Sequence, residues 1–447
     1  MELGRHLGKG IWGLADKALP VVYGLGYVLL VIRVLPEVEF GNWVLLQEIF
    51  LLVSGLATAF ALNPLLKYAA EAGEDHRDTI SAAVLMNGGF LVTVSVLLNA
   101  FRQPLGMMFH SGGLGDLMVY LPAMLAASFI RNLALVLLQS RFMVREQFYT
   151  DAVHFLGAPF LTWIWSRLHL FDQAVDLVFI NILSLSCSSL VGLFYTRGIV
   201  RLTARPAQGP LRKVWSYGVY SLGGILSTLF SGRADSFVLA AFTGPVQVAV
   251  YNSVKIFIRA YEMVTQVVQM FLLPGASHFS SRGETASLKI VVEKSLLFGT
   301  VAMIPVFLIF FFLAEPLVLA VYQGRYLAGI PQLQLFALMA FFIPALAVAT
   351  STLLGLGEAR IGFVLGIQTL AAAVILYLVL IPLLGITGAT LGYILSSIAL
   401  CWLAMRQLRR FVPFTAGEVL RRWRDIYAYV RKWAMRGKMD SRRDRHP

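Results

Sequence analysis

Twelve long apolar stretches of about 20 residues each fill the chain between residues 11 and 408, separated by short polar breaks. An α-helix needs roughly 20 apolar residues to cross a bilayer. Irregular segments and unpaired strands cannot cross, because their backbone polar groups would lack hydrogen-bond partners in the hydrocarbon core. The stretches therefore predict an all-α, polytopic membrane protein of about 12 transmembrane helices. The predicted spans are 11 to 35, 42 to 64, 79 to 101, 115 to 139, 147 to 168, 174 to 196, 214 to 242, 247 to 273, 290 to 313, 330 to 354, 360 to 382 and 386 to 408.

The composition excludes a soluble domain. Of the 447 residues 58% are hydrophobic and only 14% are charged, whereas soluble domains carry about 25% charged residues. The net charge of +13 suggests nucleic acid at first, but residues 406 to 447 hold 13 Lys/Arg against 4 Asp/Glu and supply +9 of it. We therefore predict no nucleic-acid partner. Cys187 and Cys401 lie in apolar stretches, where free cysteine behaves as a small hydrophobe, so we predict no disulfide and no metal.

The basic residues outside the spans are unevenly distributed among the connections. If the N-terminus is cytoplasmic, the inner connections hold 15 Lys/Arg without the tail, and the outer connections hold 3. Because cytoplasmic loops carry the excess of Lys and Arg, both termini are predicted to be cytoplasmic, in a multi-pass protein of the cytoplasmic (inner) membrane. The basic N-terminus runs straight into the first apolar stretch, which predicts an uncleaved first span.

Two weak internal matches share nearly the same offset. Pro36 to Trp43 resembles Gly244 to Tyr251 at an offset of 208, and Pro104-Leu105 resembles Pro316-Leu317 at an offset of 212. An even number of spans per repeat makes the halves parallel in topology. We therefore predict two pseudo-symmetric six-helix bundles around a central cavity. The predicted domains are 1–200, a cytoplasmic linker at 201–213, a second bundle at 214–410 and a tail at 411–447.

One predicted span carries a polar stripe. Its spacing of 3-4-3-4-3 places all members on one helical face. A charged side chain at mid-bilayer costs from about 2.5 to more than 10 kcal/mol, so the stripe must face polar helices or water. Its members are Asn252, Lys255, Arg259, Glu262, Gln266 and Gln269.

Embedded charged residues supply the candidate site. Arg donates as a planar fork and Lys as a compact charge, and both suit a phosphate. Carboxylates in low dielectric can exchange a proton or Na⁺ as their partners move. The predicted substrate-binding residues are Lys17, Lys255, Arg259, Arg131, Arg233, Tyr220 and Gln266; the predicted ion-coupling residues are Asp16, Asp235 and Glu262.

Several of these charges have structural alternatives. Arg259 and Glu262 share a face three residues apart and would neutralise each other. Lys255 has no such neighbour, so we predict it as the stronger substrate contact. Arg233 and Asp235 point to different faces of their helix, and each would pair with a residue on another helix. Arg131 would hold two helices together. Arg33, at the end of its span, is expected to reach the interface.

Three segments carry a resemblance to a known family. Arg33 to Trp43 reads R-V-L-P-E-V-E-F-G-N-W, Arg233 to Tyr251 contains T-G-P-V-Q-V-A-V-Y, and Pro316 to Arg360 contains Y-Q-G-R-Y. Together they resemble Wzx-type polysaccharide flippases of the multidrug/oligosaccharidyl-lipid/polysaccharide (MOP) exporter superfamily, although Pro36 and Glu37 stand where that family usually has Gly and Pro. The resemblance implies two six-helix bundles around a cavity. It also implies translocation of undecaprenyl-diphosphate-linked oligosaccharide to the outer leaflet, for O-antigen, capsule or exopolysaccharide synthesis.

Other functional classes share parts of this pattern. A small-molecule (multidrug-type) exporter would have the same fold, but one built for organic cations should gather carboxylates in its cavity. A polysaccharide polymerase or ligase generally carries a large outer loop, and every predicted outer loop here has about 15 residues or fewer. We find no P-loop, nucleophile elbow, dinucleotide fingerprint or metal-ligand spacing. We therefore expect no catalytic residues, no metal and no cofactor; transport would be coupled to H⁺ or Na⁺. We also expect a monomer, with a polysaccharide polymerase as a partner protein.

The basic tail has its own pattern. Thr415 and Glu418 have the spacing of a capping box. Apolar residues then recur at helical spacing up to Trp433, with Arg and Lys mostly on the other side. This pattern is typical of an interfacial amphipathic helix that binds anionic headgroups.

Overall fold

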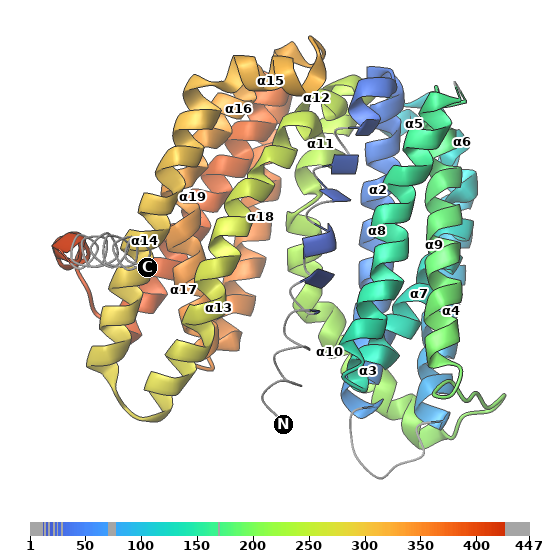
Figure 1. The fold of residues 1–447 in the computed structure, drawn as a ribbon, viewed down its shortest axis with the longest axis horizontal. Coiled ribbons are helices and arrows are strands. Elements are labelled where there is room, and N and C mark those ends of the chain that lie inside the picture. Colours follow the sequence, from blue (N-terminus) through green and yellow to red (C-terminus); the bar gives the residue numbers. More distant parts are fainter. Residues whose placement is uncertain are drawn as a thin grey trace, which may run out of the picture. The chain divides into compact units, whose positions relative to one another are not determined.

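The computed structural model describes residues 12, 15–16, 18–20, 23–24, 26–27, 30–69, 77–168 and 170–424. All regular structure in these residues is helical (Figure 1), as predicted. The described residues between 12 and 34 are helical. The α-helices that follow are α2 (Glu37–Ala57), α3 (Asn63–Ala69), α4 (Arg77–Ala100), α5 (Arg102–Met108), α6 (Gly112–Leu117), α7 (Leu121–Ser140), α8 (Val144–Arg167), α9 (Ala174–Thr196), α10 (Gln208–Ser231), α11 (Ala234–Thr243), α12 (Pro245–Lys255), α13 (Arg259–Ser281), α14 (Thr285–Phe312), α15 (Ala314–Tyr322), α16 (Ile330–Ala337), α17 (Ile343–Gly355), α18 (Ala359–Leu384), α19 (Ile386–Phe411) and α20 (Ala416–Arg421). A π-helical turn, η1 (Thr58–Leu62), joins α2 to α3, and the 3₁₀ turns are η2 (Met118–Tyr120), η3 (Ile256–Ile258), η4 (Leu327–Gly329) and η5 (Leu338–Phe341).

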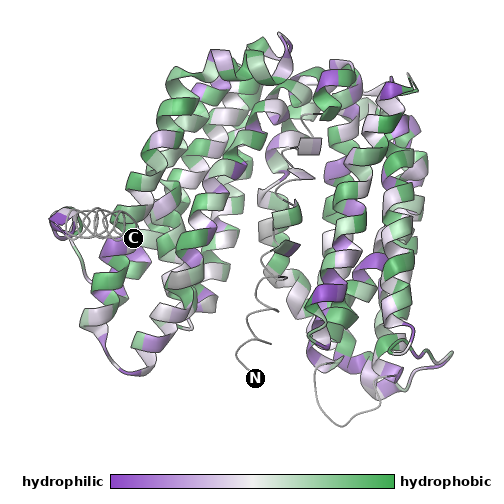
Figure 2. Ribbon diagram, in the orientation of Figure 1, coloured by the Kyte–Doolittle hydropathy of each residue, from purple (hydrophilic) through white to green (hydrophobic). Residues whose placement is uncertain are grey.

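Eight helices among the described residues are long and apolar enough to cross a membrane, and a bent pair at Leu327–Phe341 and Ile343–Gly355 makes a ninth. The other three predicted spans fall on α8, on α10 with α11, and on the partly described first helix. The chain is thus a multi-pass membrane protein, and the count of twelve stays a prediction. Figure 2 shows apolar residues along the long helices and hydrophilic residues gathered at several of the connections between them.

The order of elements repeats along the chain, as the sequence matches suggested. Pro36 caps the N-terminus of α2, and Pro245 is the first residue of α12. In each half a long helix, α4 or α14, is followed by a short one, α5 or α15, that contains the matched proline. A helix interrupted by a 3₁₀ turn comes next in both halves, at η2 and at η5. The fold therefore has the predicted two-fold pseudo-repeat, although the short helices α5 and α15 were not predicted.

The chain divides into two compact units. The first comprises Met1–Ile256, Pro316–Ile330 and Ala373–Gly392, and the second comprises Phe257–Glu315, Pro331–Ala372 and Tyr393–Pro447. The predicted domain boundaries at 200 and 213 stay predictions. The unit boundary at Ile256 lies in η3, inside the span that was predicted to be one helix.

Glycines allow α2 to approach other helices closely within the first unit. A methyl group on Gly41 would lie 2.0 Å from the carbonyl oxygen of Pro245, at the start of α12. Toward the other end, a methyl group on Gly218 of α10 would lie 2.0 Å from the carbonyl oxygen of Phe60, in the π-helical turn η1. Neither position can accept a larger side chain without moving the backbone, so the first half of the sequence packs directly against α10 and α12.

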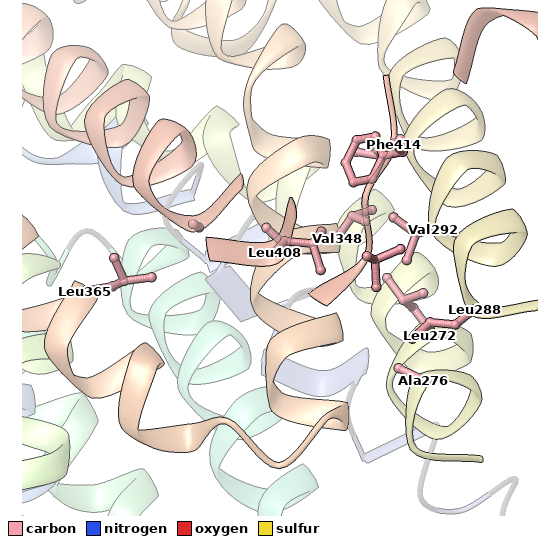
Figure 3. Packing of buried hydrophobic residues seen from close by; sticks show 12 residues of the cluster. Leu272, Ala276, Leu288, Val292, Val348, Leu365, Leu408 and Phe414 are labelled. Carbon is pink, nitrogen blue, oxygen red and sulfur yellow. The ribbon is translucent and has the colours of Figure 1, made fainter. Parts of the chain in front are cut away.

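The second unit has a core of its own (Figure 3). Twelve buried residues from α13, α14, α17, α18, α19 and the segment after α19 pack together, with Leu272, Val292 and Leu408 among them. Phe414 extends this core toward the tail, and Val419 of α20 packs against it. The tail therefore begins as part of the folded unit.

Charged residues also attach α20 to the start of α14. Thr415 and Glu418 form the predicted capping box. The Glu418 Oε1 accepts from Lys289 Nζ at 2.6 Å, and this bond, with those to Thr415, lowers the pKa of Glu418 to about 2. Arg422 Nε donates to Oε2 of Glu293, whose side chain is 1% exposed, at 2.7 Å. The tail thus supplies a counter-ion to a buried carboxylate that also pairs with Lys289. The predicted amphipathic part of the tail beyond Arg424 lies outside the described residues.

Candidate functional site

The polar stripe is divided between the two units. It lies along one helical span, Pro245–Ser281, whose α-helical geometry is interrupted, because α12 ends at Lys255, η3 follows, and α13 begins at Arg259. A 3₁₀ turn advances about 120° per residue where an α-helix advances about 100°, so three such residues rotate the later part of the stripe relative to the earlier part. Asn252 and Lys255 belong to the first unit, and the other four members belong to the second.

The stripe nevertheless occupies the less buried side of both helices. Lys255 and Arg259 are half-buried, and Glu262 and Gln266 are exposed. Near them along the chain, Tyr251, Val254 and Tyr261 are completely buried. The apolar sides of α12 and α13 therefore pack inside their own units and leave the polar positions on the outside of each.

Lys255 has a buried carboxylate partner within the first unit. Its Nζ lies 2.5 Å from Oδ2 of Asp235 on α11 and donates to the carbonyl oxygen of Gly232 at 3.3 Å. The Tyr251 hydroxyl donates to the same Oδ2 at 2.6 Å, and the Ser236 backbone N–H donates to Oδ1 at 2.8 Å. Lys255 has no carboxylate within one turn on its own helical face, as the sequence indicated, but this partner from another helix was not predicted. Its partner is on another helix, 20 residues earlier, beyond the turn at Gly244.

A second ion pair joins α2 to the region where α10 gives way to α11. Arg233 Nε lies 3.0 Å from Oε2 of Glu48, and Nη1 donates to the carbonyl oxygen of Leu229 at 3.0 Å. Both charged side chains are 18% exposed. Arg233 and Asp235 thus point to different partners, as their spacing predicted, and the Arg233 pair connects the two halves of the sequence.

A third ion pair is buried among α7, α8 and α9. Arg131 pairs through Nη2 with Oδ1 of Asp151, donates from Nε to the Ser188 hydroxyl at 3.2 Å, and lies 5.3 Å from the ring of Phe155. Its guanidinium is therefore held inside one bundle, as the structural alternative for Arg131 predicted. Nearby, His154 Nδ1 is 2.9 Å from the Ser184 hydroxyl.

Asp16 belongs to the same region. Its side chain is 4% exposed, it interacts electrostatically with Arg131, and Oδ2 accepts from Gln147 Nε2 at 3.0 Å. Its Oδ1 is buried and accepts no hydrogen bond from the described part of the chain. Asp235, in contrast, has donors on both oxygens. The two predicted coupling carboxylates thus differ in how well their oxygens are satisfied.

The remaining predicted residues are placed as follows. Tyr220 on α10 is 80% exposed, and Gln266 and Glu262 are exposed positions of α13. Lys17 lies outside the described residues. The sequence missed Glu48 and Asp151 as partners, although embedded bases and acids in similar numbers were a signal that most would pair.

Comparison with known proteins shows which family the chain belongs to. Residues 30–331, about two thirds of it, match the family described as polysaccharide biosynthesis protein. The chain belongs to this polysaccharide biosynthesis family. The match covers the three ion pairs, both short helices α5 and α15, and the whole polar stripe.

Solved structures of the MOP superfamily share the fold of this family member. An inward-facing multidrug resistance MATE family transporter is 15% identical, with a TM-score of 0.72 over 90% of this chain and 98% of the other. The lipid II flippase MurJ in an inward closed conformation is 14% identical, with a TM-score of 0.73 over 92% and 89%. A MOP superfamily transporter from Pyrococcus furiosus, described as having a binding pocket of reverse polarity, is 16% identical with a TM-score of 0.60 over 90% and 94%. The predicted resemblance is thus confirmed for the polysaccharide biosynthesis family by the sequence match and for the fold by the MOP transporter structures.

Two relatives by sequence are membrane proteins of Methanocaldococcus jannaschii. Uncharacterized membrane protein MJ1068 is 25% identical over 197 residues, and uncharacterized membrane protein MJ1375 is 27% identical over 168 residues. The alignments cover 43% and 38% of this chain and 39% of each relative's length. This member of the polysaccharide biosynthesis family is therefore a multi-pass membrane protein with the MOP transporter fold.

Proposed function

We propose that this protein is a flippase that moves undecaprenyl-diphosphate-linked oligosaccharide from the cytoplasmic to the outer leaflet of the cytoplasmic membrane, with both termini cytoplasmic. The observation that carries the proposal is the match to a polysaccharide biosynthesis family on a MOP transporter fold. The shared fold of a lipid II flippase supports a lipid-linked substrate. Such a substrate needs help only with its headgroup, because hydrocarbon cannot accept an unpaired diphosphate, whereas the polyprenyl tail dissolves in the bilayer.

The bases at the junction of α12 and α13 are proposed to bind the diphosphate. Lys255 and Arg259 are separated along the chain only by η3, and both are on the less buried side of their helices. An incoming phosphate oxygen would replace the Asp235 carboxylate as the acceptor of the Lys255 ammonium, while the Arg259 guanidinium supplies forked donors. Tyr220 and Gln266, both exposed, are proposed to bind sugar hydroxyls, with Lys17 as a further base. Arg131 and Arg233 are proposed to act through the pairs that hold the bundle.

Coupling is proposed to use a carboxylate that changes protonation or binds Na⁺ as the protein alternates. Among Asp16, Asp235 and Glu262, Asp16 is favoured, because one of its buried oxygens accepts no hydrogen bond from the described residues. Asp235 would respond indirectly, since its charge is balanced by Lys255 only while that lysine is not bound to substrate.

The test is translocation by purified protein in proteoliposomes. The probe is an undecaprenyl-diphosphate-linked oligosaccharide with a fluorophore on its sugar, and a dithionite-type quencher outside reports headgroup movement. We expect quenching beyond the outer-leaflet fraction, accelerated by an imposed proton or Na⁺ gradient, and no transport of a fluorescent organic cation. Transport of the cation without the lipid would instead indicate a multidrug-type exporter, and flipping indifferent to both gradients would eliminate the coupling proposal.

A further inference from the structure

Two arginines from opposite halves of the sequence bind each other's helix ends. Arg33, near the end of the first helix, donates from Nε to the carbonyl oxygen of Val321 at 2.8 Å and from Nη2 to that of Ala320 at 3.3 Å. Arg325, just after α15, donates from Nη1 to the carbonyl oxygen of Leu35 at 2.9 Å. Arg33 therefore binds the C-terminal end of α15, which Arg325 follows. Arg325 in turn binds the C-terminal end of the first helix, which contains Arg33. All five residues belong to the first unit.

The acceptors explain why arginine is used here. The last four carbonyl groups of an α-helix have no partner within the helix, and they form the negative end of its dipole. A guanidinium satisfies these carbonyls and is attracted by the dipole without needing a carboxylate. Both side chains are exposed, so water can solvate the donors and the carbonyls if they separate. The contact is therefore reversible, unlike the buried pair of Arg131 and Asp151.

The surroundings of the two arginines are closely packed. Gly41 of α2 touches the backbone of Pro245 in α12, and the Tyr322 hydroxyl donates to the carbonyl oxygen of Ser253 at 2.5 Å. Tyr326, with a left-handed φ of 59°, packs its ring edge-to-face against Phe40. Figure 1 shows α12 and α15 at the same end of the molecule as α5 and α6. At this end, then, the first helix and α2 meet α12 and α15 across the boundary between the sequence halves.

We propose that Arg33 and Arg325 form a reciprocal latch that closes this end of the protein, the outer end in the topology predicted from Lys and Arg. The inference rests on the proposed transport function, because alternating access requires the two halves to part at one end and then at the other. Opening exchanges three bonds to helix carbonyls for bonds to water and separates Gly41 from Pro245. The latch selects the outward-closed state, and its strength sets how often the outer end opens.

Cysteine accessibility tests the latch without any substrate. Ala249 on α12 is completely buried and is replaced by cysteine, with Cys187→Ser and Cys401→Ser removing the natural thiols. A water-soluble maleimide is applied to the protein in nanodiscs, where both faces are accessible. We expect Arg33→Gln with Arg325→Gln to raise the labelling rate at least tenfold, and Arg325→Gln alone, which keeps the two-carbonyl fork of Arg33, to raise it less.

The matched control is Arg167→Gln, which also removes an exposed arginine from a predicted outer connection and should leave the rate unchanged. Labelling that stays at the parent rate in both the single and the double variant overturns the latch, whatever the transport assay gives. An equal rise in the Arg167→Gln protein also overturns it, since the effect would then come from charge alone. Conversely, if faster labelling is found in a protein that flips no lipid, the latch stands and the proposed function fails.

Discussion

Replacing Lys255 and Arg259 together by alanine is expected to abolish headgroup translocation in proteoliposomes. A hydrogen bond to a charged group contributes about 1.5–3 kcal/mol, so two such contacts to a diphosphate correspond to about 3–6 kcal/mol. Since about 1.4 kcal/mol is a factor of ten, the expected loss is roughly 10²- to 10⁴-fold. The initial rate of quencher-protected headgroup transfer measures it, with the lipid probe described above.

Because Asp235 is buried, this experiment needs a second variant. Lys255→Ala leaves that carboxylate without its ammonium partner, and a loss of activity could then arise from misfolding. Lys255→Met with Asp235→Asn and Arg259→Ala removes the bases and keeps the interior neutral, and the same loss is expected. The control is Arg212→Ala with Lys213→Ala, two bases of the α10 start, which should flip lipid at the parent rate. Normal translocation by the neutralised triple variant would refute the assignment.

Arg131→Met is expected to lower the free energy of unfolding by about 3–5 kcal/mol, because it removes the cationic partner from a buried ion pair with Asp151. Arg131 and Asp151 are 9% and 8% exposed, so water cannot replace the lost partner. Denaturation of the detergent-solubilised protein, followed by circular dichroism, measures the change. Ser188→Ala removes a hydrogen bond to the same guanidinium and the bond that the hydroxyl donates to the carbonyl oxygen of Thr150 at 2.5 Å; at an average of about 0.6 kcal/mol for each interhelical bond in a membrane protein, it should cost about 1.2 kcal/mol.

The compensating variant decides between a structural and a substrate role for Arg131. Arg131→Met with Asp151→Leu replaces the pair by apolar residues of similar size, which is often neutral or stabilising. If Arg131 holds the bundle, this double variant recovers both stability and translocation. Recovered stability with translocation still lost would instead place Arg131 in contact with the substrate, as one sequence-based hypothesis had it.

Hydropathy predicted the long apolar helices, but not the short helices α5 and α15 or the interruptions within the long ones. The span predicted at 174 to 196 coincides with α9, because a continuous apolar run both begins and ends at polar residues there. The span predicted at 247 to 273 lies within the membrane-span candidate Pro245–Ser281, but that span contains the 3₁₀ turn η3 between α12 and α13, and no glycine or proline marks the break between Lys255 and Arg259. The π-helical turn η1 does have a local signal, because Pro64 has no N–H to donate to the carbonyl oxygen of Phe60. Gly218 of α10 packs against that same carbonyl.

The sequence singled out the embedded charged residues, but it did not predict which residues they pair with. Lys255, Asp235, Arg131 and Arg233 stood out because charge inside an apolar span is costly. Their partners did not, because each lies on another helix, and periodicity describes only one helix at a time. The Arg33 and Arg325 contacts could not be predicted for a further reason, because their acceptors are backbone carbonyls, which every residue provides.

The central claim is that the basic stripe faces water and receives the diphosphate, and protection of a cysteine at position 259 tests it most directly. Arg259→Cys is prepared with Cys187→Ser and Cys401→Ser, beside Val267→Cys, an exposed apolar position of α13 off the stripe. The account predicts rapid labelling of Cys at 259 by a water-soluble thiol reagent, slowed by saturating undecaprenyl-diphosphate-linked oligosaccharide, and slow labelling at 267 that the lipid does not change. No labelling at 259, or labelling that the lipid leaves unaltered, would contradict the claim.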